Sequence, residues 1–161
     1  MRKLVIWDFD GVIFNNPEKN YKEEFLKQLI VNGKNPQRFA KIPKNNSMNI
    51  NVLFTGRSIT QAVLIKELLK INGIEMRDFV FAKFDSHDYA LNNFMDLYYQ
   101  WKLDEMNGYF TIIFPKYQKI LLDDDIKVIN IMSNNKINVN LIHVPTWKQE
   151  WTYNDLITKN K

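Results

Sequence analysis

Residues 4–12 read Leu-Val-Ile-Trp-Asp-Phe-Asp-Gly-Val, and this stretch decides the fold. Its apolar first half is typical of a buried strand, and it ends in two aspartates, Asp8 and Asp10, followed by Gly11. Two neighbouring carboxylates cost desolvation and mutual repulsion unless a cation or a shared proton offsets them. In α/β proteins, chemistry gathers where parallel strands end. The stretch therefore predicts a metal-assisted nucleophile with an adjacent general acid and base.

Length and composition narrow the class of protein. The 161 residues predict one domain, spanning 1–161, that is large enough for a proper core. Cysteine is absent, which excludes a disulfide framework and a thiolate zinc site. Too few residues precede Asp8 for a signal-peptide core or a membrane span, so we expect a cytoplasmic protein with no membrane partner. The oligomeric state stays open.

Strand-like apolar runs alternate with helical patterns along the whole chain. The strands are expected at about residues 3–8, 50–54, 79–82, 119–122 and 139–144. The helices are expected from Asn16-Pro17 to Asn32-Gly33, from Ser58 to Asn72-Gly73, over 87–106, and briefly after Asp125. This alternation predicts an α/β fold, a three-layer Rossmann-like core in which helices cover both faces of a central parallel sheet of about five strands.

Three predicted strand ends carry polar residues. Asp8 and Asp10 follow the first strand, Thr55-Gly56-Arg57 follows the second, and Asp123 and Asp124 end the fourth. Because the strands are expected to be parallel, these groups should meet at one edge of the sheet. Carboxylate oxygens are ligands that Mg²⁺ prefers, and neither of the two histidines lies near these motifs. The constellation predicts a magnesium site.

These residues resemble a known family. Residues 8–12 (Asp-Phe-Asp-Gly-Val) look like motif I of the haloacid dehalogenase superfamily of phosphohydrolases. Residues 54–57 (Phe-Thr-Gly-Arg) resemble its motif II, and residues 122–124 (Leu-Asp-Asp) resemble its acidic motif IV. The order and spacing also fit, and the set is similar to the phosphatase domain of the Swiss Army Knife RNA-repair proteins. The resemblance implies a Mg²⁺-dependent phosphatase.

The resemblance also implies roles for the residues of motifs I and II. Asp8 would attack phosphorus and form an aspartyl-phosphate, while Asp10 would move protons and offer its main-chain carbonyl to the metal, so that both belong to the catalytic and metal sets. Thr55 would donate to the phosphoryl oxygens, and the Gly11 and Gly56 backbones would approach the phosphate. The second aspartate favours phosphoester hydrolysis over dehalogenation.

The remaining assignments leave alternatives open. Either Asp123 or Asp124 would hold Mg²⁺ directly, and Asp125 would instead cap the following helix. A lysine should neutralise the nucleophile and the phosphate; Lys102, on the helix before the fourth strand, is favoured over Lys83, which follows the third. Arg57 is expected to bind the phosphorylated substrate, or else to pair with an acidic neighbour.

The spacing between motifs bears on the substrate. Residues 11–54 hold one predicted helix and a polar loop, and residues 56–101 hold only elements of the core, so no full cap domain is expected. An open site suits a macromolecular phosphoester, and the net charge of +4 favours nucleic acid, with a polynucleotide 3′-phosphate as first choice.

Three alternatives remain beside this substrate. They are a phosphoprotein, a nucleotide or other small phosphoester with residues 34–48 as a partial lid, and a non-catalytic binding module. The aromatic residues of 147–153 could stack on bases, but packing against the core is the favoured interpretation.

Overall fold

The computed structural model describes residues 1–83, 95–152, 154 and 156, and in them five strands form one sheet. The strands are β1 (Lys3–Trp7), β2 (Asn49–Ser58), β3 (Asp78–Ala82), β4 (Gln118–Asp123) and β5 (Asn140–His143). Their order across the sheet is β3-β2-β1-β4-β5, and every neighbouring pair is parallel. The carboxyl ends of all five strands therefore lie at the same edge of the sheet.

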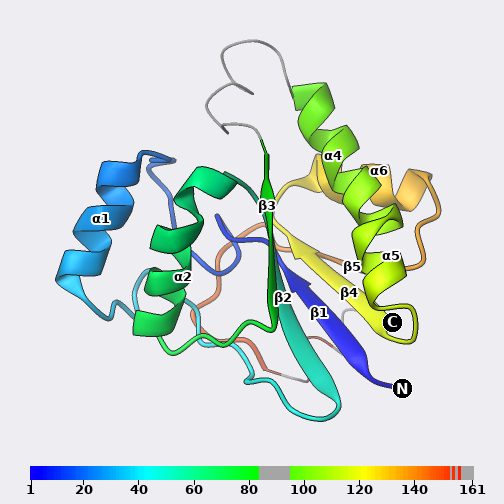
Figure 1. Ribbon diagram of the computed structural model, residues 1–161, viewed down its shortest axis with the longest axis horizontal. Helices are drawn as coiled ribbons and strands as arrows, with labels where there is room; N and C mark the ends of the chain where they lie inside the picture. The colour runs from blue at the N-terminus through cyan, green and yellow to red at the C-terminus, as the bar shows by residue number, and fades with distance from the viewer. Residues whose placement is uncertain (84–94, 153, 155, 157–161) are drawn as a thin grey trace.

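Helices cover both faces of this sheet (Figure 1). They are α1 (Glu23–Asn32), the 3₁₀ turn η1 (Ile59–Gln61), α2 (Ala62–Ile71), α4 (Met95–Asn107), α5 (Tyr109–Ile113) and α6 (Ile126–Asn134). Helices α1 and α2 lie on one face, and α4, α5 and α6 lie on the other. The predicted three-layer α/β fold is thus confirmed. None of the described helices has the length and apolar character that a bilayer crossing needs.

Alternation along β1 builds a core on each face of the sheet. Val5 and Trp7 point into the cluster beneath α1 and α2, whereas Leu4 and Ile6 point into the cluster beneath α4, α5 and α6. This period of two is the reason that a strand buried on both faces reads as a continuous apolar run.

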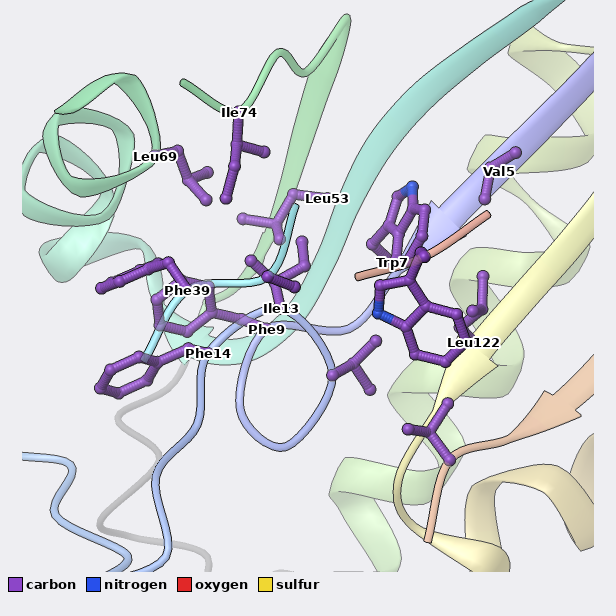
Figure 2. Packing of buried hydrophobic residues seen from close by; sticks show 14 of the residues in the cluster. Val5, Trp7, Phe9, Ile13, Phe14, Phe39, Leu53, Leu69, Ile74 and Leu122 are labelled. Carbon is purple, nitrogen blue, oxygen red and sulfur yellow. The ribbon is translucent and has the colours of Figure 1, made fainter. Parts of the chain in front are cut away.

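The first core continues past the end of β1 into three stacked rings. The ring centroids of Phe9 and Phe14 are 5.2 Å apart, and those of Phe14 and Phe39 are 5.0 Å apart (Figure 2). These rings pack beneath the turn that carries the two aspartates, so the turn rests on a rigid apolar base.

The first helix starts later than the sequence predicted. We expected Asn16 to cap it, but α1 begins at Glu23. The Asn16 side-chain oxygen instead accepts a hydrogen bond from the Asn20 N–H at 3.1 Å, and the Lys19 N–H donates to the Asn16 carbonyl. Asparagine side chains compete for backbone groups in this way, and here they close a turn where a helix was expected.

Other element boundaries also differ from those predicted. β2 extends to Ser58, because Ser58 still pairs with Ala82 of β3. The third predicted helix is seen as α4, and its residues 87–94 lie outside the described residues. Helix α5 was not predicted. Ser58 caps η1, as expected, and its hydroxyl accepts from the Thr60 N–H.

The segment after β5 closes over the first core. Trp147 donates from Nε1 to the Ile13 carbonyl at 3.1 Å, and Trp151 is buried with its ring 5.7 Å from that of Trp7. Lys41 and residues 149–151 exchange two backbone hydrogen bonds. The predicted packing of this segment is confirmed for both tryptophans, while Tyr153 lies outside the described residues.

A buried asparagine in β2 joins three segments at the other end of the sheet. Asn51 accepts a hydrogen bond from Trp7 Nε1 at 2.9 Å and donates from Nδ2 to the Pro43 carbonyl at 2.6 Å. The same Nδ2 lies 3.4 Å from the Glu75 carbonyl. Because Trp7 and Asn51 are both buried, loss of the Asn51 side chain leaves the Trp7 indole N–H without water to replace its partner.

We therefore expect Asn51→Ala to lower the free energy of unfolding by about 2–4 kcal/mol, since an indole N–H and a carbonyl lose their partners. Urea denaturation measures the change. Asn130→Ala, at an exposed position of α6, is the matched control and should stay within about 0.5 kcal/mol of the wild type. A loss below about 1 kcal/mol at Asn51 would contradict the importance of this contact.

Candidate active site

The strand ends bring the predicted site residues to one edge of the sheet. Asp8 directly follows β1, and its N–H donates to the carbonyl of Leu122 in β4 at 3.1 Å. Thr55 lies near the end of β2, and Asp123 is the last residue of β4. β1 is hydrogen-bonded to both β2 and β4, so Asp8 lies between these two side chains.

Three carboxylates and one ammonium form the centre of the site. Carboxylate oxygens of Asp8, Asp123 and Asp124 all lie within 4.8 Å of one another. Lys102 Nζ lies 3.5 Å from Asp8 Oδ1 and 3.3 Å from Asp123 Oδ2, and it donates to the Phe54 carbonyl at 2.9 Å. The Lys102 side chain is completely buried. The structure thus places Lys102 against the aspartates, whereas Lys83 is exposed after β3.

Burial and neighbouring charges shift the pKa values of Asp8, Lys102 and Asp124. Burial and the charge of Asp123 raise the pKa of Asp8 well above its ordinary value, although Lys102 lowers it. Burial alone would lower the pKa of Lys102, but the carboxylates of Asp8 and Asp123 raise it overall. Asp124 is exposed as a residue, yet desolvation of its carboxyl group and the charge of Asp123 raise its pKa to about 6.

The donor set fits a divalent magnesium ion. When ionised, the three carboxylates exceed the one ammonium by two negative charges, which a dication would balance. The clustered side-chain donors are all oxygen, the ligand type of Mg²⁺. Both Asp123 and Asp124 belong to the cluster, so either could be a direct ligand, and the Asp10 carboxylate does not belong to it.

The turn after β1 is shaped by glycine. The N–H groups of Val12, Ile13 and Phe14 all donate to the Phe9 carbonyl, which tightens the turn. Gly11 has a φ of +80°, and a Cβ there would lie 2.4 Å from Asp124 Oδ2. Gly11 is therefore required for both the backbone conformation and the close approach of Asp124.

The second aspartate has a separate environment. Arg57 grips Asp10 with two hydrogen bonds, from Nε to Oδ2 and from Nη2 to Oδ1, both 2.8 Å long. Asn16 Nδ2 donates to Oδ1 at 3.0 Å. Arg57 is only 2 % exposed and also donates to Gln61 Oε1. Of the two roles considered for Arg57, the structure shows the pairing with an acidic neighbour.

Thr55 and Gly56 complete the β2 side of the site. The Thr55 hydroxyl accepts from the Arg57 N–H at 3.1 Å, which leaves its own hydrogen as a donor. A Cβ on Gly56 would lie 2.4 Å from Tyr98 Cε2, so glycine is needed here because the Tyr98 ring packs against the backbone. Burial raises the pKa of the Tyr98 hydroxyl. The negative charges of Asp8 and of the three aspartates at the end of β4 raise this pKa further.

Asp125 supports the site from outside. Its Oδ1 accepts from the Lys127 N–H and caps α6, as expected, and its Oδ2 accepts from the Tyr99 hydroxyl at 2.9 Å. Its N–H donates to Asp123 Oδ1 at 2.9 Å. The carboxylate of Asp123 is thus fixed by the backbone on one side and by Lys102 on the other.

Sequence reasoning missed several side chains around Asp10, Gly56 and Asp125. These are Asn16, Tyr21, Gln61, Tyr98 and Tyr99. The helical spacing of Tyr98 and Tyr99 before Lys102 was a usable signal, because residues three or four apart share one face of a helix. No pattern in the sequence pointed to Asn16, which was expected to cap a helix.

Comparison with family models, with curated proteins and with solved structures finds no match for this chain. The geometry of the site is therefore the main support for a function.

The raised pKa of Asp124 has a consequence for stability without metal. A carboxyl group whose pKa is higher in the folded protein than in the unfolded chain makes the protein less stable as the pH rises. For Asp124 this loss falls between about pH 4 and about pH 6. We expect Asp124→Asn to escape this loss, so in EDTA its stability relative to the wild type should increase by about 1 kcal/mol from pH 4 to pH 7, a value reduced for solvent screening.

Thermal unfolding across this pH range measures the difference. Asp104→Asn, an exposed position of α4, is the control and should track the wild type at every pH. A difference that is flat or falls with pH would contradict the assigned electrostatics.

Proposed function

We propose that the protein is a magnesium-dependent phosphoric monoester hydrolase of the haloacid dehalogenase type, with Asp8 as its nucleophile. The observation that carries this proposal is the contact of Asp8 with Lys102 Nζ at 3.5 Å inside the cluster that Asp123 and Asp124 complete. Such a cluster costs free energy in a protein that has no use for it, because like charges are held together out of water.

Asp8, Asp123 and Asp124 would hold Mg²⁺, with the Asp10 main-chain carbonyl as a further ligand in the proposal. The bound ion would offset the repulsion between the attacking carboxylate and the phosphate. Lys102 would neutralise further charge, and the Thr55 hydroxyl would donate to a phosphoryl oxygen.

The two aspartates divide the chemistry between them. An Asp8 oxygen attacks phosphorus, the bond to the ester oxygen breaks, and Asp10 gives a proton to that leaving oxygen. Asp10 then takes a proton from a water molecule, which attacks the aspartyl-phosphate at phosphorus. This second step releases inorganic phosphate, restores the Asp8 carboxylate and returns the proton to Asp10.

The proposed substrate is a macromolecular phosphoester, with the 3′-phosphate of a polynucleotide as first choice. Between β1 and β2 the described chain holds a single helix, α1, which packs beside α2 (Figure 1). The described residues thus supply no separate domain above the strand ends, and the net charge of +4 favours a polyanion.

Asp8→Asn should remove the activity, because an amide neither attacks phosphorus nor completes the metal site. We expect phosphate release from p-nitrophenyl phosphate in Mg²⁺ to fall more than about 10³-fold. EDTA should abolish wild-type turnover, and Mg²⁺ should restore it. Asp104→Asn is the matched control and should keep full activity. Turnover that survives both Asp8→Asn and EDTA would sink the proposal.

Arg57→Lys should test the proposed role of Asp10 as the acid that protonates the leaving oxygen. Lysine cannot form the two-point contact, so Asp10 should be misplaced as an acid. An alkyl leaving group needs a proton more than p-nitrophenolate does. We therefore expect kcat to fall about tenfold more for ribose 5-phosphate than for p-nitrophenyl phosphate. Arg38→Lys, which alters the surface pair with Glu18, is the control. Equal losses on both substrates would argue against this role.

A further inference from the structure

The chemistry fixes where the leaving group lies, if the proposed function holds. Attack on phosphorus runs in line, so the leaving oxygen is opposite Asp8 and within hydrogen-bond reach of Asp10. Arg57 and Asn16 hold the Asp10 carboxylate in one orientation. The part of the substrate attached to the leaving oxygen must therefore pass whatever borders this carboxylate.

Tyr21 borders it. The segment before α1 folds back on the site, since Gln61 Nε2 donates to the Tyr21 carbonyl at 3.1 Å and Arg57 Nη2 lies 3.4 Å from the Asn20 carbonyl. The guanidinium carbon of Arg57 is 5.1 Å from the centre of the Tyr21 ring. This stack and the two hydrogen bonds place the Tyr21 ring over the Arg57 guanidinium, which in turn binds Asp10.

The Tyr21 ring is covered on one side and open on another. Arg57 lies over one face, yet the residue remains 44 % exposed. Besides burial, the charges of Asp10 and Asp124 raise the pKa of the Tyr21 hydroxyl, which shows that the ring stands within the field of the site. A large ring that is both supported and exposed beside a reaction centre offers a flat surface to a ligand.

We propose that Tyr21 is a stacking platform for the base of a nucleotide whose phosphate lies at Asp8. A planar base has a π-face that matches the exposed ring, and the Arg57 beneath would hold the ring in place. The exposed side chain of Ile59, in the turn that also contains Gln61, adds apolar surface on the same edge of the sheet.

A nucleotide fits better than a phosphotyrosine peptide, which would also present a ring. Lys19 and Lys22 lie on either side of Tyr21 in the sequence, both are exposed, and neither forms an ion pair with another described residue. Glu23 and Glu24 at the start of α1 offset part of this charge. Glu18 does not, because Arg38 pairs with it. Free lysines beside the ring favour the additional phosphates of a polynucleotide.

Two substrates that differ only in the base test the platform. We expect kcat/KM for adenosine 5′-monophosphate to exceed that for ribose 5-phosphate by about tenfold, as one stacked base allows. Tyr21→Ala should reduce this ratio about tenfold, and Tyr21→Phe should preserve it. Tyr117→Ala is the matched control, because Tyr117 also stacks on an arginine, Arg2, but precedes β4 at the opposite edge of the sheet. It should keep the wild-type ratio.

The outcomes separate the platform from the proposed function. A Tyr21→Ala variant that keeps the wild-type ratio, or loses activity equally on both substrates, overturns the platform and leaves the phosphatase intact. If the wild type hydrolyses neither substrate, equilibrium dialysis of the same two compounds judges the platform, and turnover of p-nitrophenyl phosphate judges the phosphatase separately. The platform is supported if the wild type binds adenosine 5′-monophosphate more tightly than ribose 5-phosphate and Tyr21→Ala abolishes this difference. Equal binding of the two compounds by the wild type overturns it.

Two further arms identify the source of the base. A thymidine oligonucleotide with a 3′-phosphate, compared with thymidine 3′-monophosphate, distinguishes a polynucleotide end from a free nucleotide, and preference for either supports the platform. A phosphotyrosine peptide that outperforms both, with a preference lost in Tyr21→Ala, would overturn the assignment to a base.

Discussion

The site depends on one buried ammonium. Lys102 stands completely buried between Asp8 and Asp123, and among the described residues it is the only cation that forms an ion pair with either carboxylate. Its helix, α4, also sends Tyr98 against Gly56 and Tyr99 to Asp125. One helix thus holds together the ends of β1, β2 and β4, and its packing fixes the distance between Asp8 and the aspartates at the end of β4.

The two aspartates of the Asp-Phe-Asp stretch have different surroundings because side chains alternate along an extended backbone. Phe9 points into the core, so the flanking side chains leave on the other side of the backbone and diverge in the turn that follows. Asp8 enters the lysine and carboxylate cluster, while Asp10 is claimed by Arg57 and Asn16. Adjacent carboxylates are thereby kept apart by different cations, which lowers the cost of placing them together.

Much of the fold could be predicted, because it follows from local patterns. Strands that are buried on both faces appear in the sequence as continuous apolar runs. Parallel pairing then brings Asp8, Thr55 and Asp123 to one edge of the sheet, although they lie far apart in the sequence. The sequence favoured Lys102 as the partner of Asp8, but it left open whether Arg57 would pair with an acidic residue and with which one. The contact of Arg57 with Asp10, and the reason for glycine at position 11, depend on long-range geometry that no local pattern encodes. The late start of α1 was missed because Asn16 suits a helix cap as well as a turn.

The segment that carries Trp147 and Trp151 sets an order of events during synthesis. The Ile13 carbonyl, in the turn between the two aspartates and α1, receives a hydrogen bond from Trp147, and Lys41 is bonded to residues 149–151. A ribosome adds Trp147 more than a hundred residues after Ile13, whose carbonyl it binds. A nascent chain therefore exposes its Asp-Phe-Asp turn long before Trp147 can hold that turn in place. The site is complete only after residues 147–151 have left the ribosome.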